Sequence, residues 1–288
     1  MAACGNSPFT NSKICLANIN SVLIMKKKNI AISSSRVLLF LMLLGIAATA
    51  YSKKGGRYYY ELRIYHMKTT DQEAKLDTYL QTAYVPALHR AGIPNVGVFK
   101  PVDKDSEQVV YVFIPFKSWD QYQELDSKLE ADNQYQTDGK AYIDVAYNDL
   151  PYRRIETILL KAFEKAPAPM VPQLTGAKAD RVYELRSYEG PTEKLHQNKV
   201  TMFNKGDEVG LFKRLGFNAV FYSEVLAGTH MPNLMYMTTF NNKADREAHW
   251  KTFGDDAYWK TLVAKPEYQH NVSKADITFL HPTEYSDF

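Results

Sequence analysis

The pentapeptide Glu61-Leu62-Arg63-Ile64-Tyr65 returns as Glu184-Leu185-Arg186-Ser187-Tyr188, and this repeat constrains the fold more than any other feature of the chain. The two occurrences lie 123 residues apart, a spacing too long for a solenoid unit and suited to a duplicated small domain. We therefore expect two copies of one fold, each opening with a strand that carries a Glu, an Arg and a Tyr on one face.

The first 50 residues have the pattern of a targeting segment. A basic stretch at 26–28 precedes an apolar run at 37–47, and Ala48-Thr49-Ala50 has the small side chains of a cleavage site. This order is typical of a secretory signal peptide that is cut after Ala50, with translation starting at Met25; an uncleaved anchor is the alternative. We therefore expect an exported protein, periplasmic or secreted and of bacterial type, with no membrane attachment after cleavage.

Removal of this segment changes the charge and the thiol count of the chain. Residues 1–50 hold five of the 35 Lys and Arg residues and none of the 32 Asp and Glu, so the remainder has 30 against 32 and a formal charge of −2. Because phosphate binding needs clustered positive charge, we expect no nucleic-acid partner. Cys4 and Cys15 also lie upstream of the cut, which excludes disulfides, Cys nucleophiles and Cys-based metal sites from the mature chain.

A Pro-rich stretch marks the boundary between the two copies. Ala166-Pro167-Ala168-Pro169-Met170-Val171-Pro172 has the composition of an extended, semi-rigid linker. The sequence therefore predicts a first domain over residues 57–164, a linker over 165–179 and a second domain over 180–288.

Hydrophobic spacing predicts the same element order in both domains. For the first domain it predicts strands at 58–65, 96–99, 109–114 and 155–162, a helix from the capping box Thr70-Asp71-Gln72-Glu73 to residue 91 with a kink at Pro86, and a helix from Ser118. For the second domain it predicts strands at 182–188, 219–225, 234–240 and 275–280, and helices at 192–215 and 242–253. The order βαββαβ is that of ferredoxin-like folds.

A ferredoxin-like sheet carries helices on one face, so its other face needs a second sheet. Two tandem copies supply that sheet within one chain. We therefore expect an α+β fold of two ferredoxin-like domains, packed face to face as an internal barrel-like pseudo-dimer. Further self-association into a homodimer stays open.

The repeated strand resembles the opening strand of the NIPSNAP family, and so does the run Asn242-Lys243-Ala244-Asp245-Arg246-Glu247 leading to Trp250. The resemblance covers nearly the whole chain after residue 50, as two NIPSNAP-like domains. The first copy departs from the pattern, since residues 118–122 lack the Asp-Arg-Glu triplet. The resemblance implies a fold of the dimeric α/β barrel superfamily, which also contains small monooxygenases, haem-degrading enzymes and haem-dependent peroxidases. NIPSNAP members have no agreed chemistry, so the resemblance implies a fold more than a reaction.

The polar residues of the repeated strand are the candidate site. Strand alternation places three of them on one face in each copy, which we expect to line the space between the sheets while the Leu62 face points toward helices. Arg63 and Arg186 suit bidentate capture of a carboxylate or an enolate. The candidate catalytic residues are Glu61, Glu184, Tyr65 and Tyr188. The alternative is that each Glu pairs with its neighbouring Arg in a purely structural polar layer.

No cofactor is evident from the sequence. The seven His residues show no metal-ligand spacing, and neither a phosphate-binding Gly-rich loop nor a nucleophile elbow occurs. His89 and His196 fall on the first helices at non-equivalent positions, so a haem ligand at either rests only on the superfamily resemblance.

These observations favour one functional hypothesis over two rivals. The favoured one is binding of a small anionic or aromatic molecule between the two sheets, with oxidation or rearrangement of that molecule as a further step. The rivals are a non-catalytic binding or scaffold protein with a filled barrel, and a haem-dependent enzyme. If the protein is an enzyme, a monooxygenase-like or isomerase-like activity is expected of this superfamily.

Overall fold

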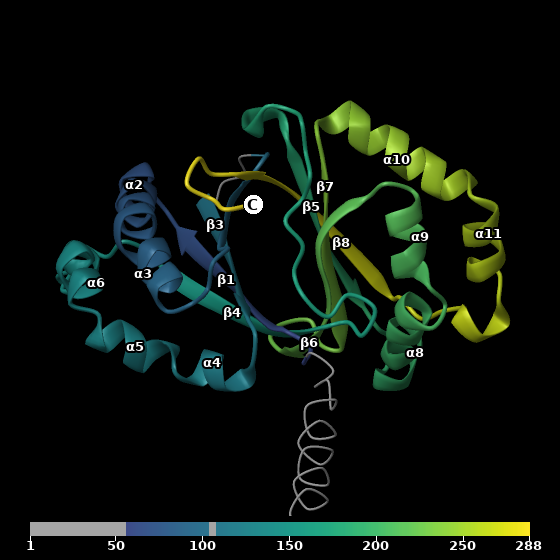
Figure 1. The fold of residues 1–288 in the computed structure, drawn as a ribbon, viewed down its shortest axis with the longest axis horizontal. Coiled ribbons are helices and arrows are strands. Elements are labelled where there is room, and N and C mark those ends of the chain that lie inside the picture. The colour runs from purple at the N-terminus through teal and green to yellow at the C-terminus, as the bar shows by residue number, and fades with distance from the viewer. Residues whose placement is uncertain (1–55, 104–107) are drawn as a thin grey trace, which may run out of the picture. The chain divides into compact units, whose positions relative to one another are not determined.

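The described part of the chain, residues 56–103 and 108–288 of a computed structural model, is built on a closed barrel of eight antiparallel strands. The predicted signal peptide, the predicted cleavage site and the predicted start at Met25 lie outside the described residues. We call residues 57–164 the first half and residues 180–288 the second half. In Figure 1 the helices of each half lie beside that half's own strands, on opposite sides of the barrel.

The first half contains β1 (Tyr59–Met67), α2 (Thr70–Tyr79), the π-helix η1 (Leu80–Tyr84), α3 (Val85–Arg90), β2 (Gly97–Pro101), β3 (Gln108–Phe116), α4 (Trp119–Gln123), α5 (Leu125–Ala131), α6 (Asn133–Asp138), α7 (Lys140–Ile143) and β4 (Arg154–Ala162). The predicted helix with a kink at Pro86 is thus three segments, in which Pro86 lies in the first turn of α3. The N-cap of α2 is Thr69 rather than Thr70, because the Thr69 hydroxyl accepts from the Gln72 amide.

The second half contains η2 (Lys178–Asp180), β5 (Val182–Glu189), α8 (Glu193–Asn204), α9 (Glu208–Arg214), β6 (Asn218–Ala227), β7 (Asn233–Phe240), α10 (Lys243–Asp255), α11 (Ala257–Val263), η3 (Pro266–Tyr268) and β8 (Lys274–Pro282). The helix predicted at 192–215 is two helices, α8 and α9. They separate at Gly206 and at Asp207, whose φ of 55° cannot continue a right-handed helix.

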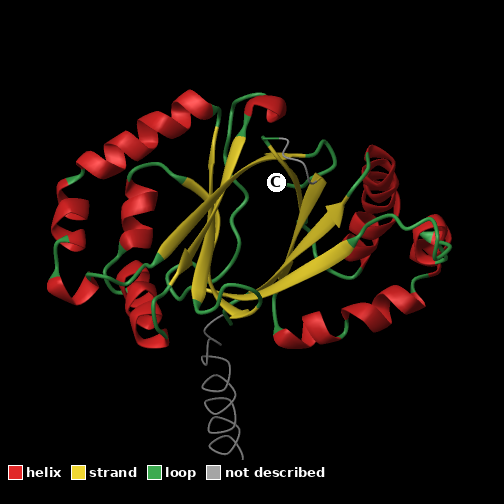
Figure 2. Cartoon of the chain, turned by 180° about the vertical axis from the view of Figure 1, so that it is seen from behind, coloured by secondary structure: helices red, strands yellow, loops and turns green. Residues whose placement is uncertain are grey.

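The strands pair in the order β1-β3-β2-β8-β5-β7-β6-β4. Within the first half the neighbours run β4-β1-β3-β2, and within the second half β8-β5-β7-β6, which is the same permutation of first, second, third and fourth strands. The halves join where β2 pairs with β8 and where β4 pairs with β6. Figure 2 shows the strands gathered at the centre with helices on either flank.

The two faces of β1 and β5 are the reverse of the prediction. Leu62 and Leu185 belong to the apolar cluster inside the barrel, while Tyr65 packs into the cluster beneath the helices. An eight-stranded barrel has just enough room for its own side chains, so a layer of charges there would lack partners. The helices supply those partners, and the charged face therefore points toward them.

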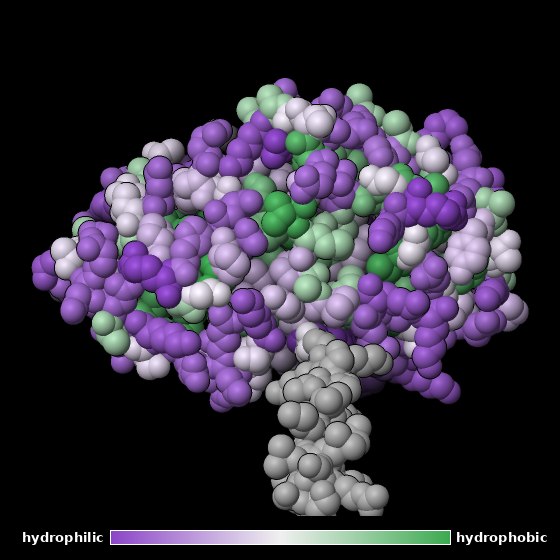
Figure 3. Space-filling view, viewed as in Figure 1, coloured by the Kyte–Doolittle hydropathy of each residue, from purple (hydrophilic) through white to green (hydrophobic). Residues whose placement is uncertain are grey.

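The inside of the barrel is filled by packed aromatic rings. The Phe113 ring stacks on Phe221 with centroids 4.8 Å apart, and lies 5.1 Å from Tyr60 and 5.6 Å from Phe288. All four side chains are at most 3% exposed. The predicted ligand space between the sheets is therefore occupied by protein. On the face seen in Figure 3, hydrophilic side chains cover the flanks and hydrophobic ones gather toward the middle.

Candidate functional sites beneath the helices

Each half places its repeated Glu, Arg and Tyr between the sheet and the overlying helices. The residues are Glu61, Arg63 and Tyr65 in β1, and Glu184, Arg186 and Tyr188 in β5. The structure therefore brings each set of three together, as alternation predicted. The two sets lie outside the barrel, on opposite sides of it, each beneath the helices of its own half. Arg63 and Arg186 therefore cannot bind the same small ligand.

In the second half, Glu184 is completely buried and its carboxylate is saturated. Oε1 accepts from Arg186 Nε at 2.6 Å and from Arg246 Nη2 at 3.0 Å. Oε2 accepts from Arg246 Nε at 2.9 Å and from the indole N–H of Trp250 at 2.8 Å. Burial alone would raise the pKa of Glu184, but the hydrogen bonds from Arg246, the charge of Arg186 and the Trp250 donor hold it below its usual value.

The same cluster encloses the Arg186 guanidinium. Arg186 Nη1 donates to the Tyr188 hydroxyl at 2.8 Å, and that hydroxyl is 2.8 Å from the hydroxyl of Tyr236. The Trp250 ring covers the guanidinium at 3.7 Å, a cation–π distance. Two helix residues, Arg246 and Trp250 of α10, thus close the site, and every charged group in it has a protein partner. This is the arrangement of a structural polar layer.

In the first half, the equivalent pair has fewer partners. Glu61 is 2% exposed and accepts one side-chain hydrogen bond within the described part of the chain, from Arg63 Nε at 2.7 Å. The Arg63 side chain is 22% exposed, and besides Glu61 it interacts with Tyr65, the counterpart of Tyr188. Tyr122, four residues after the Ser118 N-cap, stands where Arg246 stands after Asn242. A second guanidinium for the carboxylate is therefore missing.

Tyrosines replace those partners in the first half. The rings of Tyr84, Tyr79 and Tyr142 form what we call the tyrosine column. Tyr79 stacks on Tyr84 at 5.6 Å and on Tyr142 at 3.6 Å, the latter with rings only 4° from parallel. Arg63 lies 5.4 Å from the Tyr84 ring at the inner end of the column. Burial raises the pKa of all three phenols, with neighbouring tyrosines adding to it, so they are neutral at physiological pH.

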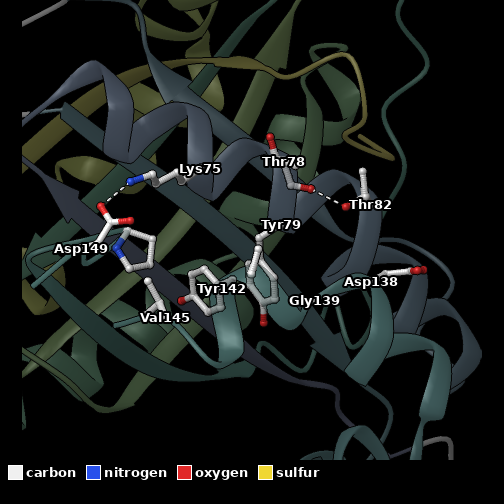
Figure 4. Close-up of a pocket in the computed structure, with 11 residues that line it drawn as sticks. Lys75, Thr78, Tyr79, Thr82, Asp138, Gly139, Tyr142, Val145 and Asp149 are labelled. Atoms are coloured by element: carbon white, nitrogen blue, oxygen red, sulfur yellow. Dashed lines mark hydrogen bonds and ion pairs between the residues drawn. The ribbon is translucent and has the colours of Figure 1, made fainter. Parts of the chain in front are cut away.

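A cavity opens at the outer end of the tyrosine column (Figure 4). Its volume is about 270 Å³, and it lies between α2, the loop after α7 and the turn at Gly139. Tyr79 and Tyr142 line it together with Lys75, Asp138 and Asp149. Figure 4 shows the two rings side by side, with the Lys75–Asp149 ion pair beyond them. The volume is just below the lower end of the range usual for small-molecule sites.

The cavity connects with the repeated motif through hydroxyl groups. Burial raises the pKa of Tyr65, while hydrogen bonding with Arg63 and with Tyr142 opposes that rise. Tyr142 thus has its ring in the cavity wall and its hydroxyl at Tyr65. A continuous polar path leads from the cavity through these two phenols to Arg63 and Glu61.

Sequence reasoning missed the tyrosine column because its members do not share one period. Tyr79 and Tyr84 are five residues apart and meet through the wider turn of η1, whereas Tyr142 comes from a distant helix.

Sequence reasoning also missed a buried ion pair in the second half. Lys199 Nζ lies 2.9 Å from Glu208 Oε2, with both side chains at most 6% exposed. A Lys within an otherwise buried helical face is the one signal that could have indicated this pair.

The histidines give no metal centre. His89 is 39% exposed and pairs with Asp287 at 2.7 Å, whereas His196 is buried and burial lowers its pKa. Among residues 56–103 and 108–288, no group of three or more His, Cys, Asp or Glu side chains is placed to hold a metal ion. None of the helices described there is long and apolar enough to cross a membrane.

Residues 183–287 match the NIPSNAP family model, and they span the second half from β5 to the loop after β8. The second half is a NIPSNAP domain. The motif Glu184-Leu185-Arg186 and the Asp245-Arg246-Glu247 helix start, which carried the resemblance, meet in the NIPSNAP domain at the saturated Glu184 carboxylate.

Solved structures resemble the described barrel as a whole. A candidate monooxygenase from Fusobacterium nucleatum subsp. nucleatum is 6% identical, with 79% of this chain and 93% of that chain covered and a TM-score of 0.53. A candidate monooxygenase from Lactobacillus acidophilus is 12% identical, with 78% and 94% covered and a TM-score of 0.50. A NIPSNAP family protein from Agrobacterium tumefaciens is 16% identical, with 42% and 98% covered and a TM-score of 0.33. At such identities the likeness to the two candidate monooxygenases shows the fold alone. No protein of curated function matches the chain.

Proposed function

We propose that this protein binds a small aromatic molecule in the cavity of the first half, with Tyr79 and Tyr142 as its aromatic wall. The observation that carries the proposal is the cavity of about 270 Å³ at the open end of the tyrosine column. Offset stacking of a ligand ring on the partly exposed Tyr142 ring would contribute affinity beyond simple burial, and Tyr79 supports that ring from behind. This site replaces the space between the sheets, which aromatic side chains fill.

The difference between the two halves supports this choice of site. Glu184 and Arg186 have their hydrogen-bonding groups occupied by partners in β5 and α10, so this pair is not available to hold a ligand. Within the described part of the chain, Glu61 keeps unused hydrogen-bonding capacity, and buried polar groups in native proteins generally have partners. Arg63, Glu61 and Tyr65 act in this proposal as the polar backing of the cavity rather than as direct ligands. Arg186 and its neighbours are structural.

We also propose how the fold is divided into domains and that the chain is exported. Each half is proposed to be one ferredoxin-like unit, because both have the order βαββαβ and the same strand permutation. Export is proposed from the pattern of residues 1–50. Oxidation of the ligand is a further step that the names of the two candidate monooxygenases suggest for proteins of this fold.

A second candidate is a non-catalytic scaffold, and one observation favours it. The barrel is filled by its own rings, as in the packed contacts of Phe113, and this makes the strands a rigid support for outer helices. Under this candidate the cavity is an incidental hollow between helices, and no small molecule binds in it.

The experiment is a screen of aromatic fragments by saturation-transfer NMR on the mature chain. We expect hits whose signals disappear in Tyr142→Ala and persist in Tyr147→Ala. Tyr147 is the matched control, because it is a tyrosine that is 90% exposed and does not line the cavity. Tyr142→Phe keeps the ring and should keep most of the hits. Hits that respond equally to both alanine variants, or a screen without hits, would favour the scaffold.

A further inference from the structure

The cavity wall has one basic side chain, and its charge is already used. Lys75 Nζ lies 2.5 Å from Asp149 Oδ1 and 2.9 Å from Asp71 Oδ2. Two carboxylates therefore share one ammonium group, and this small cluster has a net negative charge. An anionic ligand would have to displace both carboxylates to reach Lys75.

A further carboxylate in the wall has only a neutral partner. Both oxygens of Asp138 are 2.8 Å from the Nε2 of Gln134, an amide donor from the same turn of α6. Since an amide donor carries no charge, the negative charge of Asp138 is not neutralised within the cavity. The wall thus has one positive and two negative side chains, and Asp71 adds a third negative group behind Lys75.

The aromatic side chains of the cavity wall also favour a positively charged ligand over an anionic one. The faces of phenol rings carry negative partial charge, so they attract cations that come within about 6 Å of the ring centre. The Tyr79 ring is stacked between Tyr84 and Tyr142, so of the two lining rings it is Tyr142 that keeps a face for a ligand. The protein's own nearby guanidinium, Arg63, lies at the other end of the tyrosine column and does not line the cavity.

We propose that the cavity selects positively charged aromatic molecules, that is, arylalkylamines with an ammonium group on a short chain, over neutral and anionic molecules with the same ring. The inference rests on the proposed function and adds the charge of its ligand. The ligand packs against Tyr142, with its ammonium group on the side of the uncompensated carboxylates. The anionic ligands expected from the sequence are disfavoured, because that expectation placed Arg63 and Arg186 in the binding site.

The test uses three probes that share one ring. Tryptamine is a cation, 3-ethylindole is neutral and indole-3-propionate is an anion at pH 7. Affinities for the mature chain are measured by isothermal titration calorimetry at low and high salt. We expect tryptamine to bind roughly 3- to 10-fold more tightly than 3-ethylindole at low salt, as for a cation–π contact with a partly exposed carboxylate nearby, and indole-3-propionate to bind most weakly.

Two matched variants identify the source of the preference. Asp138→Asn keeps the shape and removes one negative charge, so the preference for tryptamine should shrink by about 2- to 4-fold while 3-ethylindole binds as before. Glu130→Asn removes an exposed carboxylate on α5, outside the cavity wall, and should leave all three affinities unchanged.

The outcomes separate the charge inference from the function on which it rests. If 3-ethylindole binds and depends on the Tyr142 ring, but tryptamine binds no more tightly, the charge preference is wrong and the proposed function stands. If indole-3-propionate binds most tightly, the inference is overturned in the opposite direction. If none of the three probes binds, this ligand class is wrong, and the proposed function then depends on the fragment screen.

Discussion

Glu61 and Glu184 occupy equivalent positions of β1 and β5, yet within the described residues Glu61 accepts one side-chain hydrogen bond where Glu184 accepts four. Both carboxylates are at most 2% exposed. The two copies of the motif therefore differ in role. The copy at Glu184 forms a structural cluster in the NIPSNAP domain, whereas the copy at Glu61 has fewer partners and lies beside a cavity. It also predicts that the same substitution has different costs in the two halves.

Replacing Glu184 by Ala should destabilise the fold much more than replacing Glu61. Glu184→Ala leaves Arg186 without its carboxylate in a buried site, and breaking a buried pair in this way costs about 3–5 kcal/mol. Glu61→Ala removes a single hydrogen bond to a partly exposed arginine, which costs about 1 kcal/mol. Urea denaturation followed by circular dichroism measures both values. Equal losses would show that the two clusters have the same structural role.

The stability that Glu184 provides should depend on pH in the acidic range. Its pKa in the folded chain lies below its ordinary value of 4.5, so its contribution is fully present above that value and is lost as the pH falls through the folded pKa. Glu184→Gln lacks this titration. We therefore expect the difference in unfolding free energy between the wild type and Glu184→Gln to be largest near pH 7 and to shrink below pH 4.5. A difference that stays constant down to pH 3 would contradict the assignment.

The buried pair of Lys199 and Glu208 should be replaceable only as a unit. Lys199→Met leaves the buried Glu208 carboxylate without its ion-pair partner. Burial already raises the pKa of Glu208 despite the charges of Lys199 and Arg186, so we expect a loss of about 3 kcal/mol or more. The double variant Lys199→Met with Glu208→Met should recover most of that loss, because neither charge is then left unpaired. The double-mutant cycle from thermal or urea unfolding gives the coupling. Additive losses in the double variant would argue against a coupled pair.

The packing of the barrel predicts a large effect of Phe113→Ala. This change removes a ring that contacts Tyr60, Phe221 and Phe288, and such truncations cost about 3–5 kcal/mol. Binding of aromatic probes at the cavity of the first half should be unchanged, since Phe113 faces the other side of the sheet. The melting temperature and the tryptamine affinity are the two measurements. A new, tighter binding event in the variant would indicate that the emptied barrel itself accepts ligands.

Much of the architecture was predictable from the sequence because strand alternation and helix caps are local signals. The repeated motif gave two strands at β1 and β5, and Ser118 and Asn242 cap their helices as expected. Alternation also placed Glu61, Arg63 and Tyr65 together on one face. It could not say which face meets the barrel, since both faces of these strands are buried and each has enough apolar neighbours to form a core.

The candidate site was less predictable because it depends on contacts between distant segments. Tyr79 comes from the end of α2 and Tyr142 from α7, 63 residues later, and no period in the sequence links them. The sequence did indicate that the first copy departs from the family pattern at residues 118–122. That departure matters, since with Tyr122 in place of an arginine Glu61 accepts a single side-chain hydrogen bond among the described residues.

The closure of the barrel has a consequence for association with other molecules. Each half taken alone would expose the edges of its outer strands, but β2 pairs with β8 and β4 pairs with β6. Among the described residues, the sheet therefore has no unpaired edge to which a partner chain could add a strand. A second copy or another protein must then attach through the helices and loops, where side chains rather than backbone hydrogen bonds determine which partner is accepted.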